Sequence, residues 1–130
     1  MRAVVVRDGH VLLVQRSADE DLFPNVWQCP AGGQEAGESV EETLARELLE
    51  ETGLALASAR RIGSDLTFLD RNGGIEWWEP HNFLVEVGPG DVRLSHEHQA
   101  FAWLPLAVAD RHPGLSAEGQ AAIRQARRTL

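Results

Sequence analysis

The sequence predicts an α/β fold, and three observations support this class. Aliphatic and β-branched runs separated by turn residues predict short strands along most of the chain. A capped, amphipathic stretch from Val40 to Thr52 predicts one helix, and the segment after Ser116 predicts a second. The length of 130 residues suits one domain, so we expect residues 1–130 to form a single unit.

The first two predicted strands form a hairpin. Residues 3–6 and 11–14 are aliphatic, and Asp8-Gly9 between them is a preferred two-residue turn. Arg16 follows the second strand, where it can bind a phosphate or simply be an exposed arginine at a strand end. After a polar loop, residues 27–30 predict a short strand that enters a glycine-rich segment.

The next predicted element is the helix. Ser39 and Glu42 form a capping box, which predicts a helix that begins at Val40. Gly53 suits the left-handed position that ends a helix, so the last helical residue is expected at Thr52. The glycine-rich entry loop is a poor start for a purely structural helix, which suggests that the loop approaches a ligand.

The two sides of this helix differ in character. At about 100° per residue, Glu47, Glu50 and Glu51 share one side. The other side is expected to face the core with four apolar residues, which are Leu44, Ala45, Leu48 and Leu49. Arg46 lies one turn before Glu50 and one turn after Glu42, so it can hold these carboxylates through i,i+4 pairs.

A row of carboxylates has two interpretations. Acidic helix faces are commonly just solvated. Three carboxylates on one narrow face, however, raise each other's proton affinity unless a cation joins them. Oxygen ligands favour a hard divalent ion, Mg²⁺ or Mn²⁺, and Mg²⁺ usually combines a few carboxylates with water and substrate phosphates. This interpretation favours phosphate chemistry.

Several strands are expected after the helix. Residues 55–62, 65–70, 75–78 and 81–87 are strand candidates, and the Asn72-Gly73-Gly74 sequence is a turn signal. Adjacent strand residues point to opposite faces, so one of Trp77 and Trp78 can line a groove and stack on a nucleobase. The alternative is that both tryptophans cover the core or an interface between subunits.

Polar residues crowd just before the last predicted strand. Glu97 is expected at the edge of that strand, where a loop can reach the helix; from its spacing alone it could equally be a solvated loop residue. His96 and His98 flank Glu97, and paired histidines beside a glutamate also fit a transition-metal site, which nothing else in the sequence completes. Residues 106–110 predict a short helix, and the terminal helix is expected to end at Arg127-Arg128.

Composition limits the classes of partner. The 12 Lys+Arg residues, all arginine, and 20 Asp+Glu give a net charge of −8, which offers no general attraction for nucleic acid polymers or membranes. The single cysteine, Cys29, excludes an internal disulfide and is interpreted as a small buried hydrophobe. No signal peptide or membrane span is recognised, so a cytoplasmic location is expected.

The stretch from residue 32 to residue 54 resembles the signature of the Nudix hydrolases. That signature is Gly, five residues, Glu, seven residues, Arg-Glu, an aliphatic, one residue, Glu-Glu, one residue, Gly and an aliphatic. It is matched without a gap by Gly32, Glu38, Arg46, Glu47, Leu48, Glu50, Glu51, Gly53 and Leu54. The resemblance implies an α/β/α sandwich with a mixed, curved sheet, in which the signature helix and the terminal helix cover opposite sides.

The resemblance also implies a reaction: water attacks phosphorus in a nucleoside diphosphate linked to another group, with Mg²⁺ or Mn²⁺ bound by the enzyme. It implies that Glu50 and Glu51 are metal ligands and that Glu47 is a ligand or the base. In the same way, Glu38 is a supporting carboxylate, Gly32 offers a backbone carbonyl to the metal, and Arg46 is an orienting catalytic group.

The substrate remains open between two classes. Residues 94–104 are similar to a segment of diadenosine tetraphosphate hydrolases that returns a glutamate to the metal site, which makes Glu97 a candidate ligand or base. Those enzymes use tyrosine near the bases and this chain has none, so Trp77, Trp78 or Phe101 would have to replace it. The stretch before the helix is equally similar to (deoxy)nucleoside triphosphate pyrophosphatases. A nucleotide-binding sensor without activity is the alternative, and a homodimer is compatible with the tryptophan-rich strands.

Overall fold

The computed structural model describes residues 1–64, 67–71 and 73–130, with only the backbone described at 67–71 and 76–78. The elements are β1 (Arg2–Arg7), β2 (His10–Arg16), β3 (Trp27–Gln28), α1 (Val40–Thr52), β4 (Leu56–Ser64), β5 (Thr67–Arg71), β6 (Gly74–Trp78), β7 (His81–Val87), β8 (His98–Pro105), the 3₁₀ helix η1 (Ala109–Arg111) and α2 (Ala117–Thr129).

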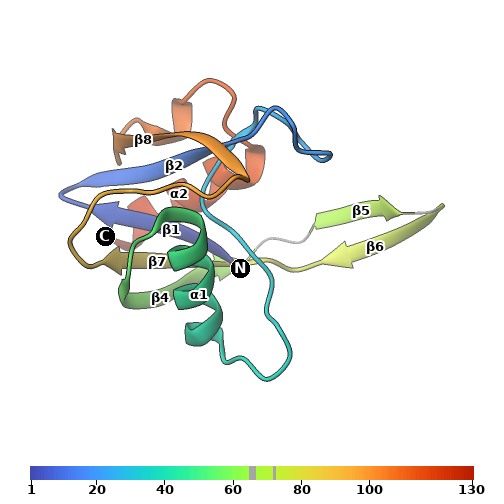
Figure 1. Ribbon diagram of the computed structural model, residues 1–130, viewed down its shortest axis with the longest axis horizontal. Helices are drawn as coiled ribbons and strands as arrows, with labels where there is room; N and C mark the ends of the chain where they lie inside the picture. Colours follow the sequence, from blue (N-terminus) through green and yellow to red (C-terminus); the bar gives the residue numbers. More distant parts are fainter. Residues whose placement is uncertain (65–66, 72) are drawn as a thin grey trace.

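Within these residues, six strands form one mixed sheet. Its order is β3-β2-β1-β7-β4, and β8 also pairs with β2. β1 and β7 are parallel, whereas the other neighbours in this sheet are antiparallel. Helices α1 and α2 lie on opposite sides of the sheet (Figure 1), which confirms the expected α/β/α arrangement.

The two central strands build two cores because their side chains alternate between the faces. The core under α1 contains Ala3, Val5, Leu12, Val14, Leu44, Leu48, Leu54, Phe83 and Val85. The core under α2 contains Val4, Val11, Leu13, Cys29, Ala109, Leu115, Ala122, Ile123 and Ala126. Cys29 is buried as expected, and burial raises the pKa of its thiol to about 12. The predicted hairpin turn is confirmed, with positive φ at Asp8 and Gly9.

Helix α1 begins and ends where the sequence predicts, but one side of it was assigned incorrectly. Ser39 and Glu42 form the capping box, and Gly53 takes the left-handed conformation at the end. Leu49, expected in the core, is 58% exposed, whereas Glu51 is only 4% exposed. The reason is geometric: Glu51 follows Leu44 and Leu48 at i+7 and i+3, so it continues their buried stripe.

Two other regions complete the comparison with the sequence. Strands β5 and β6 pair as a separate hairpin that extends away from the main sheet (Figure 1). The side chains of Trp77 and Trp78 lie outside the described residues.

The short helix expected at 106–110 is wrong in extent, since only Ala109–Arg111 form a 3₁₀ turn. No helix in the described part of the chain is long and apolar enough to cross a membrane.

Candidate active site

The glycine-rich loop lies directly against helix α1. A Cβ atom built on Gly32 would overlap the Glu47 carboxyl group, so only glycine fits there while Glu47 keeps this position. The Gly32 nitrogen donates to the Met1 carbonyl at 2.9 Å, and the Met1 amino nitrogen donates to the Gly32 carbonyl at 2.7 Å. These contacts hold the loop backbone beside the carboxylates of the helix.

Arg46 is the centre of a hydrogen-bonded carboxylate network. Its guanidinium donates to both oxygens of Glu38, at 2.6 and 2.9 Å. It also donates to Glu47 at 2.9 Å and to Glu50 at 3.3 Å, which confirms the expected i,i+4 pair. The hydrogen bonds from Arg46 lower the pKa of Glu38 to about 2. Arg46 therefore holds the carboxylates of Glu38 and Glu47 in place. Glu42 caps the helix and does not pair with Arg46.

Glu51 is the exception in this cluster. It is 4% exposed, and its Oε2 atom has no hydrogen-bond partner among the described residues. Burial raises the pKa of its carboxyl to about 8, and the charges of Glu47, Glu97 and Glu50 add to this rise. A buried, unpaired carboxylate is costly unless it binds a proton or a cation. The orphaned oxygen therefore fits the divalent cation that the sequence motif implies.

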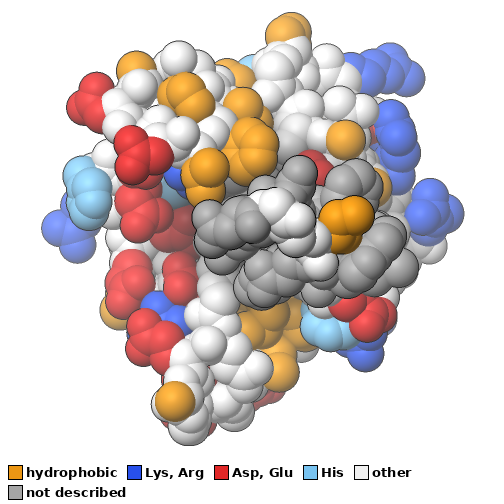
Figure 2. All heavy atoms as spheres, turned by 90° about the vertical axis from the view of Figure 1, so that its right-hand side faces the viewer, with side chains coloured by type: hydrophobic (Ala, Val, Ile, Leu, Met, Phe, Trp, Pro, Cys, Tyr) orange, Lys and Arg blue, Asp and Glu red, His pale blue; other side chains and the backbone are white. Residues whose placement is uncertain are grey.

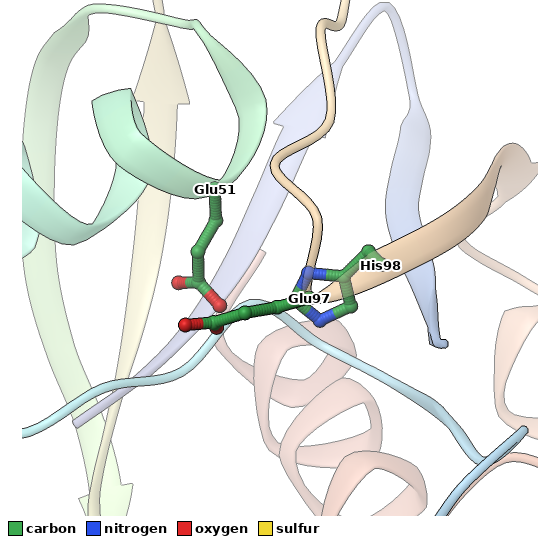
Figure 3. A group of neighbouring side chains, drawn as sticks. All are labelled: Glu51, Glu97 and His98. Atoms are coloured by element: carbon green, nitrogen blue, oxygen red, sulfur yellow. The ribbon is translucent and has the colours of Figure 1, made fainter. Parts of the chain in front are cut away.

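Glu97 reaches this position from a distant part of the chain. It lies just before β8, and its carboxylate points toward that of Glu51 from the far side of the site (Figure 3). One ligand atom from each of Glu51, Glu97 and His98 lies within 4.8 Å of the other two. The loop before β8 therefore brings Glu97 close to Glu51 of α1, and its role as a ligand or base stays a prediction.

His98 belongs to the same group of side chains, although the sequence indicated it only as part of an incomplete transition-metal site. Its Nδ1 atom is buried without a partner among the described residues, and burial lowers the pKa of the ring. The pairing of β2 with β8 shifts by one residue, so Arg16 pairs with His98 after Gln15 has paired with Ala100. This bulge turns His98 to the face that carries α1, whereas unbroken alternation would place it on the other face.

Four residues outside the carboxylate cluster were predicted to contact the substrate. Arg16 lines a groove together with Gln28 and Gly32, but its side chain also donates to the Leu22 carbonyl at 2.8 Å. Phe101 is 44% exposed on β8 and pairs with Val14, so it lies on the face that carries α1. Trp77 and Trp78 cannot be assigned to this groove, because their side chains are outside the described residues.

The electrostatic result is a strongly acidic site. Figure 2 shows acidic side chains gathered along one side of this face, with a basic side chain among them. The residues that could hold a divalent cation are Glu47, Glu50, Glu51 and Glu97 together with the Gly32 carbonyl. The arrangement suits the binding of cations that in turn attract an anionic phosphate chain.

Comparison with known proteins identifies relatives of this fold and site. The family model described as NUDIX domain matches residues 2–126. A CTP pyrophosphohydrolase of Escherichia coli is 33% identical over 116 residues, which cover 83% of this chain and 82% of that protein. The nucleoside triphosphatase NudI of Escherichia coli is 42% identical over 108 residues, covering 78% of this chain and 77% of that protein.

A larger protein shares part of this sequence. An octanoyltransferase of Myxococcus xanthus is 38% identical over 103 residues, which cover 78% of this chain but only 28% of that protein.

Two solved structures have the same fold. A MutT NUDIX hydrolase from Burkholderia pseudomallei superposes with a TM-score of 0.80 at 28% identity, covering 95% of this chain and 93% of the other. A C. elegans Ap4A hydrolase binary complex superposes with a TM-score of 0.70 at 25% identity, covering 99% of this chain and 93% of the other.

Proposed function

Because the chain belongs to the Nudix family of pyrophosphohydrolases, we propose that it hydrolyses a pyrophosphate bond of a small nucleotide with a divalent cation, Mg²⁺ or Mn²⁺. We further propose that residues 1–130 act as one Nudix domain. The observation that carries the proposal is the buried Glu51 carboxylate, whose Oε2 atom has no partner among the described residues. A bound cation would neutralise the charges of this site and of the phosphates.

Each residue of the cluster has a proposed role. Glu50, Glu51 and Glu97, with the Gly32 carbonyl, hold the cations. Glu47, whose carboxylate is fixed by Arg46, is a further ligand of these cations. Arg46 positions Glu47 and Glu50, and Glu38 keeps Arg46 in place through two hydrogen bonds.

Two carboxylates are candidates for the base that takes a proton from the attacking water. Glu47 accepts a hydrogen bond from Arg46 at 2.9 Å, so one of its oxygens is already engaged. Glu97 is exposed, and its carboxylate has no hydrogen-bond partner among the described side chains. A carboxylate has two oxygens, so one can bind a cation while the other accepts the proton. We therefore assign the base to Glu97.

The relatives favour one substrate class. The names of the CTP pyrophosphohydrolase and the nucleoside triphosphatase support a nucleoside triphosphate or its deoxy form. A dinucleoside polyphosphate is the second candidate, favoured by the likeness to the Ap4A hydrolase structure and by the segment around Glu97. Arg16, at the groove beside Gly32, is the proposed phosphate contact, and Phe101, Trp77 or Trp78 would contact a base.

A phosphate-release screen tests the proposal. It compares nucleoside triphosphates, dinucleoside polyphosphates, nucleotide sugars and ADP-ribose, each with and without Mg²⁺, for the native chain and for Glu51→Gln. We expect turnover that requires the cation and falls sharply in the variant. Tight nucleotide binding without turnover would instead support a sensor, and equal turnover by Glu51→Gln would overturn the assignment of the site.

A further inference from the structure

His98 contributes a nitrogen to a group of atoms otherwise formed by carboxylates. One ligand atom of its ring lies within 4.8 Å of ligand atoms of both Glu51 and Glu97 (Figure 3). Ligands of one octahedral ion at about 2.1 Å are about 3.0 Å apart at right angles and about 4.2 Å apart on opposite sides. The three groups are therefore close enough for side-chain rotations to bring them onto one cation.

The burial of these atoms indicates a built site. Glu51 and His98 are each 4% exposed. Glu51 Oε2 and His98 Nδ1 are both buried without a hydrogen-bond partner among the described residues. Two orphaned polar atoms in one group cost free energy that a shared ligand would recover.

The other side of the imidazole has an orienting contact. His98 Nε2 lies 3.1 Å from Nε2 of Gln28, on the short strand β3. The oxygen and nitrogen of a glutamine amide exchange places by a 180° rotation, after which Nε2–H of His98 donates to the Gln28 oxygen. That bond leaves a lone pair on Nδ1, and metal-binding histidines commonly have such a partner for the second nitrogen.

The bulge in β8 provides a structural reason for this placement. The shift of register at Gln15 and Arg16 brings His98 to the face of the sheet that carries Glu51. Bulges often redirect a side chain next to a functional site. His96 is exposed two residues away, so the burial is particular to His98.

From these contacts we propose that Glu51, Glu97 and His98 form a mixed carboxylate–imidazole site that binds transition-metal ions, Mn²⁺ among them, more tightly than Mg²⁺. The proposal rests on the proposed cation-dependent function and specifies one of its ligands. An imidazole ligand favours ions of the transition series, whereas Mg²⁺ prefers oxygen ligands alone. The remaining carboxylates, Glu47 and Glu50, would stay available for Mg²⁺ that enters with the substrate.

Spectroscopy of the bound metal tests this proposal without measuring activity. Mn²⁺ is added to the native chain in the absence of nucleotide, and electron spin-echo modulation reports nitrogen nuclei coupled to the ion. We expect ¹⁴N coupling that changes to the ¹⁵N pattern when histidine is labelled with ¹⁵N. Bound Mn²⁺ without nitrogen coupling would overturn the proposal while leaving the carboxylate site intact; a failure to bind Mn²⁺ would contradict the cation site itself.

Two variants assign the nitrogen to one residue. His98→Asn is expected to lose the coupling and to weaken Mn²⁺ binding about 10-fold, with a much smaller change for Mg²⁺. His96→Asn is the matched control and should keep the coupling and both affinities. Loss of the coupling in His96→Asn, or its persistence in His98→Asn, would overturn the assignment to His98. If His98→Asn does not fold, the labelled native spectrum alone decides whether histidine binds the ion.

Discussion

Helices α1 and α2 are similar in construction but opposite in charge balance. Each has 13 residues, begins after a serine cap and covers one face of the same sheet. At α1, one guanidinium, that of Arg46, lies within 4.0 Å of four carboxylates, those of Glu35, Glu38, Glu47 and Glu50. At α2, the single carboxylate of Asp110 pairs with two guanidinium groups, those of Arg124 and Arg127.

The two networks differ in whether their charges are fully paired. Both oxygens of the buried Asp110 accept hydrogen bonds from arginine, and these bonds lower the pKa of its carboxyl to about 2. The network at α2 is therefore complete without a ligand. The network at α1 has an excess of negative charge and leaves Glu51 Oε2 without a partner among the described residues. Because the charges at α2 are fully paired, the excess of negative charge at α1 favours the proposed cation site.

The largest expected effect is the loss of activity when Glu51 is neutralised. Glu51→Gln should lower kcat/KM by roughly 10²–10³-fold, as expected for removal of one major electrostatic contact in an active site. Its stability in metal-free buffer at neutral pH should stay within about 1 kcal/mol of the native chain, because a carboxyl group with a pKa of about 8 is already mostly protonated and glutamine replaces one neutral group by another. Steady-state kinetics with Mg²⁺ and urea unfolding measure the two quantities. A strongly destabilised Glu51→Gln chain would mean that α1, like α2, carries a mainly structural network.

The corresponding change at α2 should act on stability alone. Asp110→Asn leaves Arg124 and Arg127 without their shared carboxylate, and because the two arginine side chains are 51% and 32% exposed, the change should cost about 1–2 kcal/mol. The folded variant should keep its native kcat/KM, since Asp110 lies in η1, on the face opposite to α1. Urea unfolding measures the loss, and kinetics on the folded variant provide the control. A fall in kcat/KM as large as that of Glu51→Gln would abolish the distinction between the two helices.

Local signals were sufficient to predict α1 and its ends, but not the burial of its residues. The capping box and Gly53 depend on neighbouring residues, so both were recognised. The burial of Glu51 depends on how the helix is rotated against the sheet, which a helical repeat with mixed apolar and acidic positions does not determine. Leu49 was placed in the core for the same reason.

Contacts between distant segments explain the other differences. The orientation of His98 follows from a register shift between β2 and β8, which alternation in β8 alone cannot predict. The pairs of Asp110 with Arg124 and Arg127 join η1 to α2, so the sequence of either segment alone does not predict them. The Nudix signature, by contrast, is contiguous, and its carboxylates lie together because one helix and its entry loop carry them.

Acid should weaken the network at α2. The folded-state pKa of Asp110 is about 2, below its ordinary value, so its contribution to stability is complete above about pH 4 and is lost as the pH falls toward 2. The stability difference between the native chain and Asp110→Asn should therefore be constant from pH 7 to about pH 5 and should shrink at lower pH. Urea unfolding at several pH values measures it. A difference that is unchanged near pH 2 would show that the charge of Asp110 does not stabilise the fold.

The smallest expected effects come from the two serine caps, which form a matched pair. Ser116 accepts one hydrogen bond, from the Gly119 nitrogen at 3.1 Å, so Ser116→Ala should cost about 1 kcal/mol. Ser39 accepts from the Glu42 nitrogen at 3.1 Å, and its own nitrogen donates to the Glu42 carboxylate at 3.2 Å.

Removal of Ser39 should therefore destabilise the chain by a similar or slightly larger amount, again about 1 kcal/mol. The two changes should differ in their effect on the reaction. Ser39 begins the helix that carries Glu47, Glu50 and Glu51, so fraying of its first turn should loosen the nearby Thr43 contact to Glu38 and lower kcat/KM several-fold. Ser116→Ala should leave kcat/KM unchanged, although it destabilises the chain about as much as the change at Ser39. Equal kinetic effects of the two variants would show that the position of the carboxylates does not depend on the start of α1.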